Sequence, residues 1–85
     1  MPAKIFLLSN QADKAISKFP LKIQNKIDGA FDKLKTNPLA GAKLGGELGG
    51  KYKFRIGDYR IVYKFNPKES RLEIVKIEHR QGVYK

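Results

Sequence analysis

The sequence predicts an α+β fold, with an N-terminal strand, two helices and then a three-stranded antiparallel meander, both helices packed on one face of the sheet. Three observations lead to it. Apolar residues recur at helical spacing from residue 12 to residue 34, they alternate with basic residues from residue 51 onward, and a glycine-rich stretch separates the two patterns. The 85 residues suffice for one domain, residues 1–85, which folds without disulfides because the chain has no cysteine.

The first half of the chain predicts a strand and two helices. Ala3–Leu8 is β-prone, and Ser9 or Asn10 can cap the helix that follows. One apolar stripe of that helix is formed by Ala12, Ala15, Ile16 and Phe19. Pro20 begins the second helix, where its missing N–H is harmless, and Asn37-Pro38 ends it. The inner face of the second helix is formed by Ile23, Ile27, Phe31 and Leu34.

Residues 39–50 hold five glycines and predict a loop, with Leu44 and Leu48 tucked beneath the sheet. The loop is not a phosphate-binding loop, because no helix start follows it and neither nucleotide-binding glycine spacing is present.

Three strands follow, and the last one is irregular. The predicted strands and turns are strand 51–56, turn Gly57-Asp58, strand 59–65, turn Asn66–Ser70 and strand 71–78. Alternation in the last strand breaks at Ile74-Val75, which fits either a central strand covered on both faces or a β-bulge.

The hairpin around Gly57-Asp58 concentrates positive charge. A two-residue loop sets Arg55 opposite Arg60 and Lys51 opposite Lys64. Like charges in such positions destabilise a hairpin by tenths of a kcal/mol to about 1 kcal/mol per pair, so folding alone does not explain them. We interpret this face as a phosphate-binding surface; the alternative is a basic face that only meets water. Its members are Lys51, Lys53, Arg55, Arg60 and Lys64.

The composition favours a polyanionic partner. The formal charge is +10, from 18 Lys and Arg against 8 Asp and Glu, and all four arginines lie in the last 35 residues. The apolar run near the N-terminus is too short for a signal peptide, and no stretch approaches a membrane span. We therefore expect a soluble, cytoplasmic protein without a membrane partner.

The C-terminal residues add further candidates for chemistry. His79 is the only histidine, and it serves either as an acid–base group or as a structural residue. Tyr84 either stacks on a base or anchors the tail. With scattered acids and no cysteine, we expect no metal and no small-molecule cofactor. The reaction that suits such a surface is metal-free RNA cleavage, in which the ribose 2′-OH attacks the adjacent phosphorus and cations neutralise the phosphorane.

The segments RIGDYR (55–60) and HRQGVY (79–84), with the order of elements, resemble the RelE/ParE toxin superfamily of type II toxin–antitoxin systems. The resemblance implies a toxin bound by an acidic antitoxin protein. RelE-like members cut messenger RNA (mRNA) in the A site of the 70S-type ribosome, whereas ParE-like members poison DNA gyrase. The expected function is the first, a ribosome-dependent mRNA endonuclease. The alternatives are a gyrase poison, or a non-toxic basic module that acts with its antitoxin.

The resemblance also implies roles for individual residues. Lys53 and Arg55 match the basic pair near the 2′-OH and the phosphate, and Arg60 matches the arginine that stabilises the scissile phosphate. Arg80 matches a transition-state arginine, and Tyr84 a tyrosine that stacks on the base or assists proton transfer. Some relatives have a catalytic histidine at the position of His79. This chain has Arg at position 55 where relatives have Lys, and Arg is a poor base. The carboxylate base of some relatives has no clear counterpart, although Glu47 precedes the hairpin.

Overall fold

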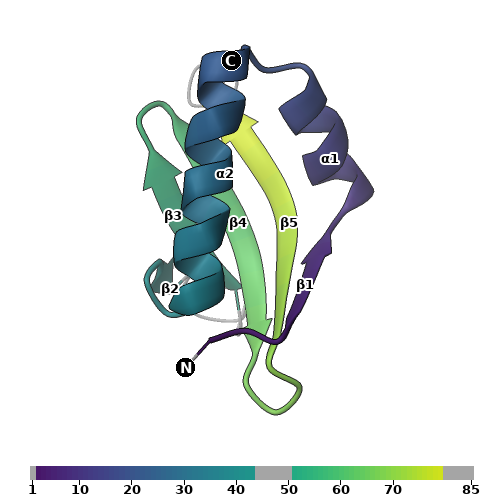
Figure 1. Cartoon of the computed structure of the whole chain (residues 1–85), viewed down its shortest axis with the longest axis vertical. Helices are drawn as coiled ribbons and strands as arrows, with labels where there is room; N and C mark the ends of the chain where they lie inside the picture. Colours follow the sequence, from purple (N-terminus) through teal and green to yellow (C-terminus); the bar gives the residue numbers. More distant parts are fainter. Residues whose placement is uncertain (1, 44–50, 80–85) are drawn as a thin grey trace.

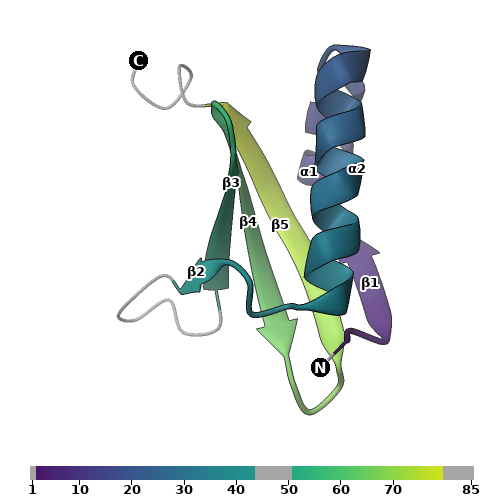
Figure 2. The same ribbon diagram turned by 60° about the vertical axis from the view of Figure 1, so that its left-hand side comes forward.

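The computed structural model describes residues 2–43 and 51–79 and confirms the predicted α+β class (Figure 1). The elements, in chain order, are β1 (Ile5–Leu8), α1 (Asn10–Ser17), α2 (Leu21–Thr36), β2 (Ala42–Lys43), β3 (Lys51–Ile56), β4 (Tyr59–Asn66) and β5 (Arg71–His79). The sheet order is β1-β5-β4-β3-β2, with β1 parallel to β5 and the other pairs antiparallel. Both helices lie on one side of the sheet (Figure 2).

The start of each helix shows how the sequence sets its limits. Ser9 is the N-cap of α1, and its Oγ accepts a hydrogen bond from the N–H of Ala12 at 3.1 Å. Pro20 is the N-cap of α2 and so lies just before the first helical residue. The first helix ends at Ser17, earlier than its apolar stripe suggests, yet Phe19 still packs against the core.

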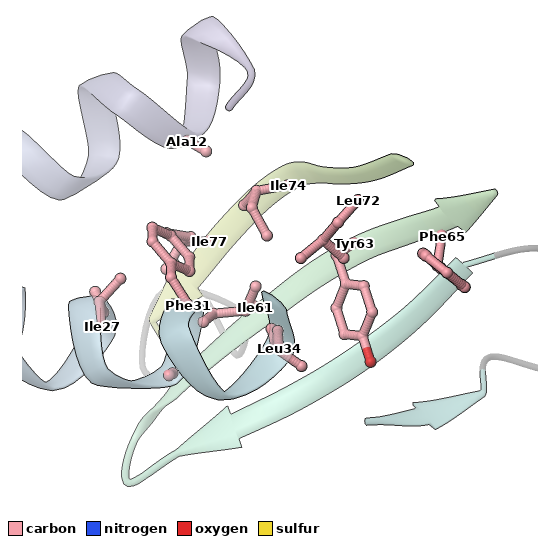
Figure 3. Close-up of a cluster of buried hydrophobic side chains, with 11 residues drawn as sticks. Ala12, Ile27, Phe31, Leu34, Ile61, Tyr63, Phe65, Leu72, Ile74 and Ile77 are labelled. Carbon is pink, nitrogen blue, oxygen red and sulfur yellow. The ribbon is translucent and has the colours of Figure 1, made fainter. Parts of the chain in front are cut away.

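The core lies between the helices and the inner face of the sheet (Figure 3). Ile27, Phe31 and Leu34 of α2 are buried, as the apolar stripe predicts. The buried residues that the strands contribute are Ile61, Tyr63, Phe65, Leu72, Ile74 and Ile77. Full burial of a side chain of this size contributes about 1.5–3 kcal/mol, so this layer supplies most of the driving force for folding.

Part of the predicted loop 39–50 is a strand, which corrects the sequence interpretation. Ala42 and Lys43 pair with Lys53 and Tyr52 of β3. A strand of two residues has no side-chain periodicity to detect; its position is set instead by the backbone just before it. Residues 44–50, including Leu44, Leu48 and Glu47, lie outside the described residues.

The hydroxyl of Tyr63 holds the backbone between α2 and β2. It donates a hydrogen bond to the carbonyl of Pro38 at 2.8 Å and accepts one from the N–H of Gly41 at 2.9 Å. Burial raises the pKa of Tyr63, so the phenol stays protonated and able to donate. A Cβ at Gly41 would lie 2.6 Å from both the Lys53 carbonyl oxygen and the Tyr63 hydroxyl oxygen, which explains the glycine there.

The irregularity in β5 is a β-bulge at Val75, which decides between the two alternatives left open by the sequence. Val62 pairs with Lys76 while the next residue, Tyr63, pairs with Ile74, so Val75 has no partner on β4. The Val75 carbonyl instead accepts a hydrogen bond of 2.5 Å from the Ser9 hydroxyl. The bulge is therefore tied to the start of α1.

Replacing Tyr63 with Phe is expected to lower the free energy of unfolding by about 1–3 kcal/mol, because it removes the partner of a buried carbonyl and of an N–H. Urea denaturation of the two proteins measures the difference. Tyr52→Phe is the control, because the Tyr52 ring stacks on Tyr63 at 5.3 Å but its hydroxyl has no hydrogen bond among the described residues. Equal losses in the two variants would contradict the role of the Tyr63 hydroxyl.

Candidate phosphate-binding face

The predicted hairpin register is confirmed, and it gathers five cations on one face. Arg55 pairs with Arg60, Lys51 with Lys64, and Lys53 with Val62. Alternate residues of β3 and β4 pack against the core, so these side chains point to the opposite side of the sheet. No helix among the described residues covers that side (Figure 2). We call it the open face; the five predicted cations on it are Lys51, Lys53, Arg55, Arg60 and Lys64.

Strand β5 adds two acids to this face, Glu73 and Glu78, and the sequence interpretation missed them. The cross-strand rows are Arg55–Arg60–Glu78, Lys53–Val62–Lys76 and Lys51–Lys64–Glu73. The open face is therefore less uniformly basic than the hairpin alone suggested. The signal lay in the broken alternation at Ile74-Val75, because only a bulge there sends residues 76 and 78 to the side that carries Glu73.

Glu78 forms an ion-paired cluster with Arg60 and Lys76. The Nε of Arg60 donates to Oε1 of Glu78 at 3.1 Å, and its Nη2 donates to the same oxygen. The Nζ of Lys76 lies 3.2 Å from Oε2. The hydrogen bond from Arg60, followed by that from Lys76, holds the pKa of Glu78 below its usual value despite partial burial. Arg60 was predicted to await a phosphate; in this structure it already holds a carboxylate.

The cations of β3 differ from Arg60 in this respect. Among residues 2–43 and 51–79, no acidic group lies within ion-pair distance of Lys51, Lys53 or Arg55. Arg55 is also exposed, whereas Arg60 is half-buried. We call these three residues the β3 column. Within the described residues, the exposed Lys64 of β4 is likewise without an ion pair.

His79 lies on the opposite side of the sheet from the cations of the open face. It pairs with Tyr59, whose side chain lies on the helix side of the sheet. The His79 ring lies 4.6 Å from the Tyr59 ring, and Tyr59 in turn lies 4.7 Å from Phe19. Successive residues of a strand point to opposite faces, so with Glu78 on the open face its neighbour faces the helices. The other two predicted residues, Arg80 and Tyr84, lie outside the described residues.

The described residues give no sign of a metal centre or of a membrane segment. No group of three or more His, Asp or Glu side chains within residues 2–43 and 51–79 is placed to hold a metal ion. Neither described helix combines the length and the apolar character needed to cross a bilayer.

The chain is thus a small α+β protein with a mixed sheet, two helices on one side of it and cations on the other, and comparison with known proteins gives its family. Residues 6–84 match the family model described as "ParE toxin of type II toxin-antitoxin system, parDE". Toxin RelG of Mycobacterium tuberculosis is 30% identical over 76 residues, 87% of each chain. The chain thus belongs to the RelE/ParE family of type II toxin–antitoxin toxins.

Solved structures agree with this assignment. The M. tuberculosis toxin–antitoxin complex RelBE2 is similar with a TM-score of 0.80 and 28% identity, over 94% of each chain. The archaeal RelE–RelB complex of Pyrococcus horikoshii OT3 is similar with a TM-score of 0.81 and 28% identity, over 94% of this chain and 97% of that chain. The likeness extends over nearly the whole chain, so it includes the strands that carry the open face.

Glu78→Gln is expected to destabilise the protein at pH 7 by at most about 1 kcal/mol, since Arg60 is 39% exposed and solvent screens the pair. A carboxyl whose pKa is lowered by folding stabilises the fold above its ordinary pKa, 4.5, and this contribution is lost as the pH falls through the folded value. The deficit of the variant should therefore shrink below pH 4.5. Urea unfolding at pH 7 and at acid pH measures it.

Glu73→Gln is the control for that measurement, because it removes one negative charge from the same strand and face without breaking an ion pair of the described residues. A deficit of Glu78→Gln that stays the same at every pH would show that the ion pairs do not stabilise the fold.

Proposed function

We propose that the protein is a ribosome-dependent endonuclease that cleaves mRNA in the A site, without a metal ion, by attack of a ribose 2′-OH on the adjacent phosphorus. The observation that carries this proposal is the open face, where five cations share one side of a hairpin at a cost in cross-strand repulsion. A phosphate backbone offsets that repulsion. The likeness to toxins named RelE and RelG adds support.

The proposed reaction makes two demands on the protein. The 2′-oxygen loses its proton and bonds to phosphorus, and the bond from phosphorus to the 5′-oxygen breaks, which leaves a 2′,3′-cyclic phosphate and a 5′-hydroxyl. Negative charge accumulates on the phosphorane oxygens, where arginine and lysine stabilise it. Lys53 and Arg55 lie next to the β4 strand that carries Arg60, so one phosphate can meet cations of both strands. Arg80 and Tyr84 complete the proposed set.

Proton transfer is the weaker part of this site. Arginine, the residue at position 55, is a poor general base, and Glu78 is a weak one because its ion pairs lower its pKa. The open face thus suits charge stabilisation better than acid–base chemistry. We propose that the ribosome compensates by holding the RNA in line for attack, which is worth many orders of magnitude when the geometry is right. The proposed activity also requires a cytoplasmic location, where ribosomes and mRNA meet.

Arg60→Ala is expected to reduce codon-phased mRNA cleavage about 10²- to 10³-fold, the usual effect of removing one group that stabilises transition-state charge. Primer extension on mRNA from a purified translation system measures it. Lys26→Ala, which removes an exposed cation from α2 on the other side of the molecule, is the matched control and should cleave normally. Undiminished cutting by Arg60→Ala would refute the proposed role. A 2′-deoxy substitution at the attacking ribose should abolish the cuts.

A gyrase poison is the second candidate, and the description of the matching family model as a ParE toxin favours it. It leaves the cations of the open face without a phosphate to bind. Induction in cells separates the two: arrested translation with intact DNA supports the nuclease, whereas gyrase-dependent DNA breaks with intact translation support the poison. Growth without arrest would indicate the third possibility, a non-toxic basic module.

The proposed partner is an acidic antitoxin. The relatives named RelBE2 and RelE–RelB were solved as toxin–antitoxin complexes, and a chain of charge +10 attracts an acidic one. The complex is expected to dissociate faster and to form more slowly as salt rises, because exposed charges are screened beyond about 8 Å at physiological ionic strength. Surface plasmon resonance over a salt series measures both rates. Binding that is weak and independent of salt would contradict the electrostatic contribution.

A further inference from the structure

The cluster of Arg60, Lys76 and Glu78 has a feature that phosphate binding alone does not explain. If Arg60 serves a phosphate, an acid beside it is a disadvantage, because it repels the ligand. Yet Oε1 of Glu78 accepts two donors of Arg60, and Oε2 lies 3.2 Å from the Nζ of Lys76. One carboxylate thereby occupies two cations of the open face.

A carboxylate and a phosphate compete for the same guanidinium. Both present oxygens at a spacing that matches the fork of arginine N–H donors. The lowered pKa of Glu78 keeps the carboxylate ionised at neutral pH, so it is a charged competitor there. The ion pair is also partly exposed, with Arg60 at 39% and Glu78 at 24%, and exposed pairs are weak enough to exchange for a better-placed anion.

The position of the cluster in the sheet adds a second observation. Glu78 ends the row that begins with Arg55 and continues through Arg60. Arg55 has no acid within ion-pair distance among the described residues, and neither do its β3 neighbours Lys51 and Lys53. The cations of the open face are therefore of two kinds: those without an ion pair among the described residues, which are the β3 column and Lys64, and the ion-paired Arg60 and Lys76.

We propose that Glu78 is an internal competitor of RNA phosphate: it holds Arg60 and Lys76 in the free protein, and a phosphate engages these two cations only by displacing it. This inference rests on the proposed function for the identity of the phosphate as RNA. The β3 column makes the first, loose contact with the RNA backbone. Arg60 binds the RNA only when a phosphate is held beside the row Arg55–Arg60–Glu78. Glu78 therefore makes the protein bind a positioned phosphate in preference to a polyanion in loose contact.

Removing the competitor should release both cations to RNA. The probe is a fluorescein-labelled single-stranded RNA of about 12 nucleotides, with 2′-O-methyl riboses so that it cannot be cleaved. Each phosphate newly neutralised on a single strand steepens the dependence of log Kobs on log salt by about 0.7. If one or two cations are released, raising the salt from about 50 to 200 mM should lower the RNA affinity of Glu78→Gln by a factor about 3 to 7 times larger than it lowers the RNA affinity of wild type. Fluorescence anisotropy with the full chain measures this.

Two comparisons separate release of the cations from simple loss of a negative charge. Glu73→Gln removes the same charge from the same face and should tighten binding without steepening the salt dependence, because no ion pair of the described residues involves it. In the background of Arg60→Ala with Lys76→Ala, Glu78→Gln should behave as Glu73→Gln does. Circular dichroism and urea unfolding confirm that each variant is folded.

Three outcomes would overturn the inference: an unchanged salt slope in Glu78→Gln, an equal change in Glu73→Gln, or a gain that survives the loss of both cations. None of these measurements depends on cleavage or on the ribosome. If Glu78→Gln shows the steeper salt slope but the protein cuts no mRNA, the nuclease proposal is refuted and the competition by Glu78 is supported. If the protein cuts mRNA but the slope does not change, the nuclease is supported and the competition is refuted.

Discussion

The bulge at Val75 is the constraint on which the arrangement of the open face depends. It lets Glu73 and Glu78 share one face of β5 although five positions separate them, and it turns His79 toward the helices. A slip of one residue in a strand moves every side chain to the other face, so the bulge must be fixed for the site to exist. The Ser9 hydroxyl fixes it by joining the Val75 carbonyl while also capping α1. One serine thus couples the start of a helix to the composition of the open face.

The open face balances folding against binding. Rows that place Arg55 against Arg60 and Lys51 against Lys64 disfavour the sheet, and the buried layer beneath β4 has to offset that cost. Glu73 and Glu78 lower the cost on the β5 side, since each stands opposite a β4 cation. The β3 column has no such compensation among the described residues. The positive charge without an acid opposite it thus lies on β3, whereas the acids of β5 stand opposite the cations of β4.

The features predicted from the sequence are those that a local signal fixes. Gly57, with a φ of 58°, and Asp58 form a two-residue loop, and such a loop determines the register of the whole β3–β4 hairpin. The bulge was only one of two alternatives, because its support, Ser9, lies 66 positions away in the chain. The faces of Glu78 and His79 follow from that bulge and were missed with it. The short strand β2 depends on hydrogen bonds to the Tyr63 hydroxyl, which no pattern in residues 39–50 encodes.

If the protein has the proposed function, the chemistry of the open face gives a physical reason why its cleavage of mRNA would depend on the ribosome. A cation lowers the energy of a phosphorane only when the phosphate is within its reach, and we propose that a phosphate reaches Arg60 only by displacing Glu78. An RNA that drifts across the β3 column offers no fixed phosphate to drive that exchange, nor does the face offer it a strong base. An RNA that the ribosome holds in line for attack has already lost its positional entropy. The free-energy cost of exchanging Glu78 for the phosphate is therefore lower at the one phosphate that is to be cut. On the proposed function, the carboxylate that weakens the site for free RNA thereby also directs the site toward ribosome-bound mRNA.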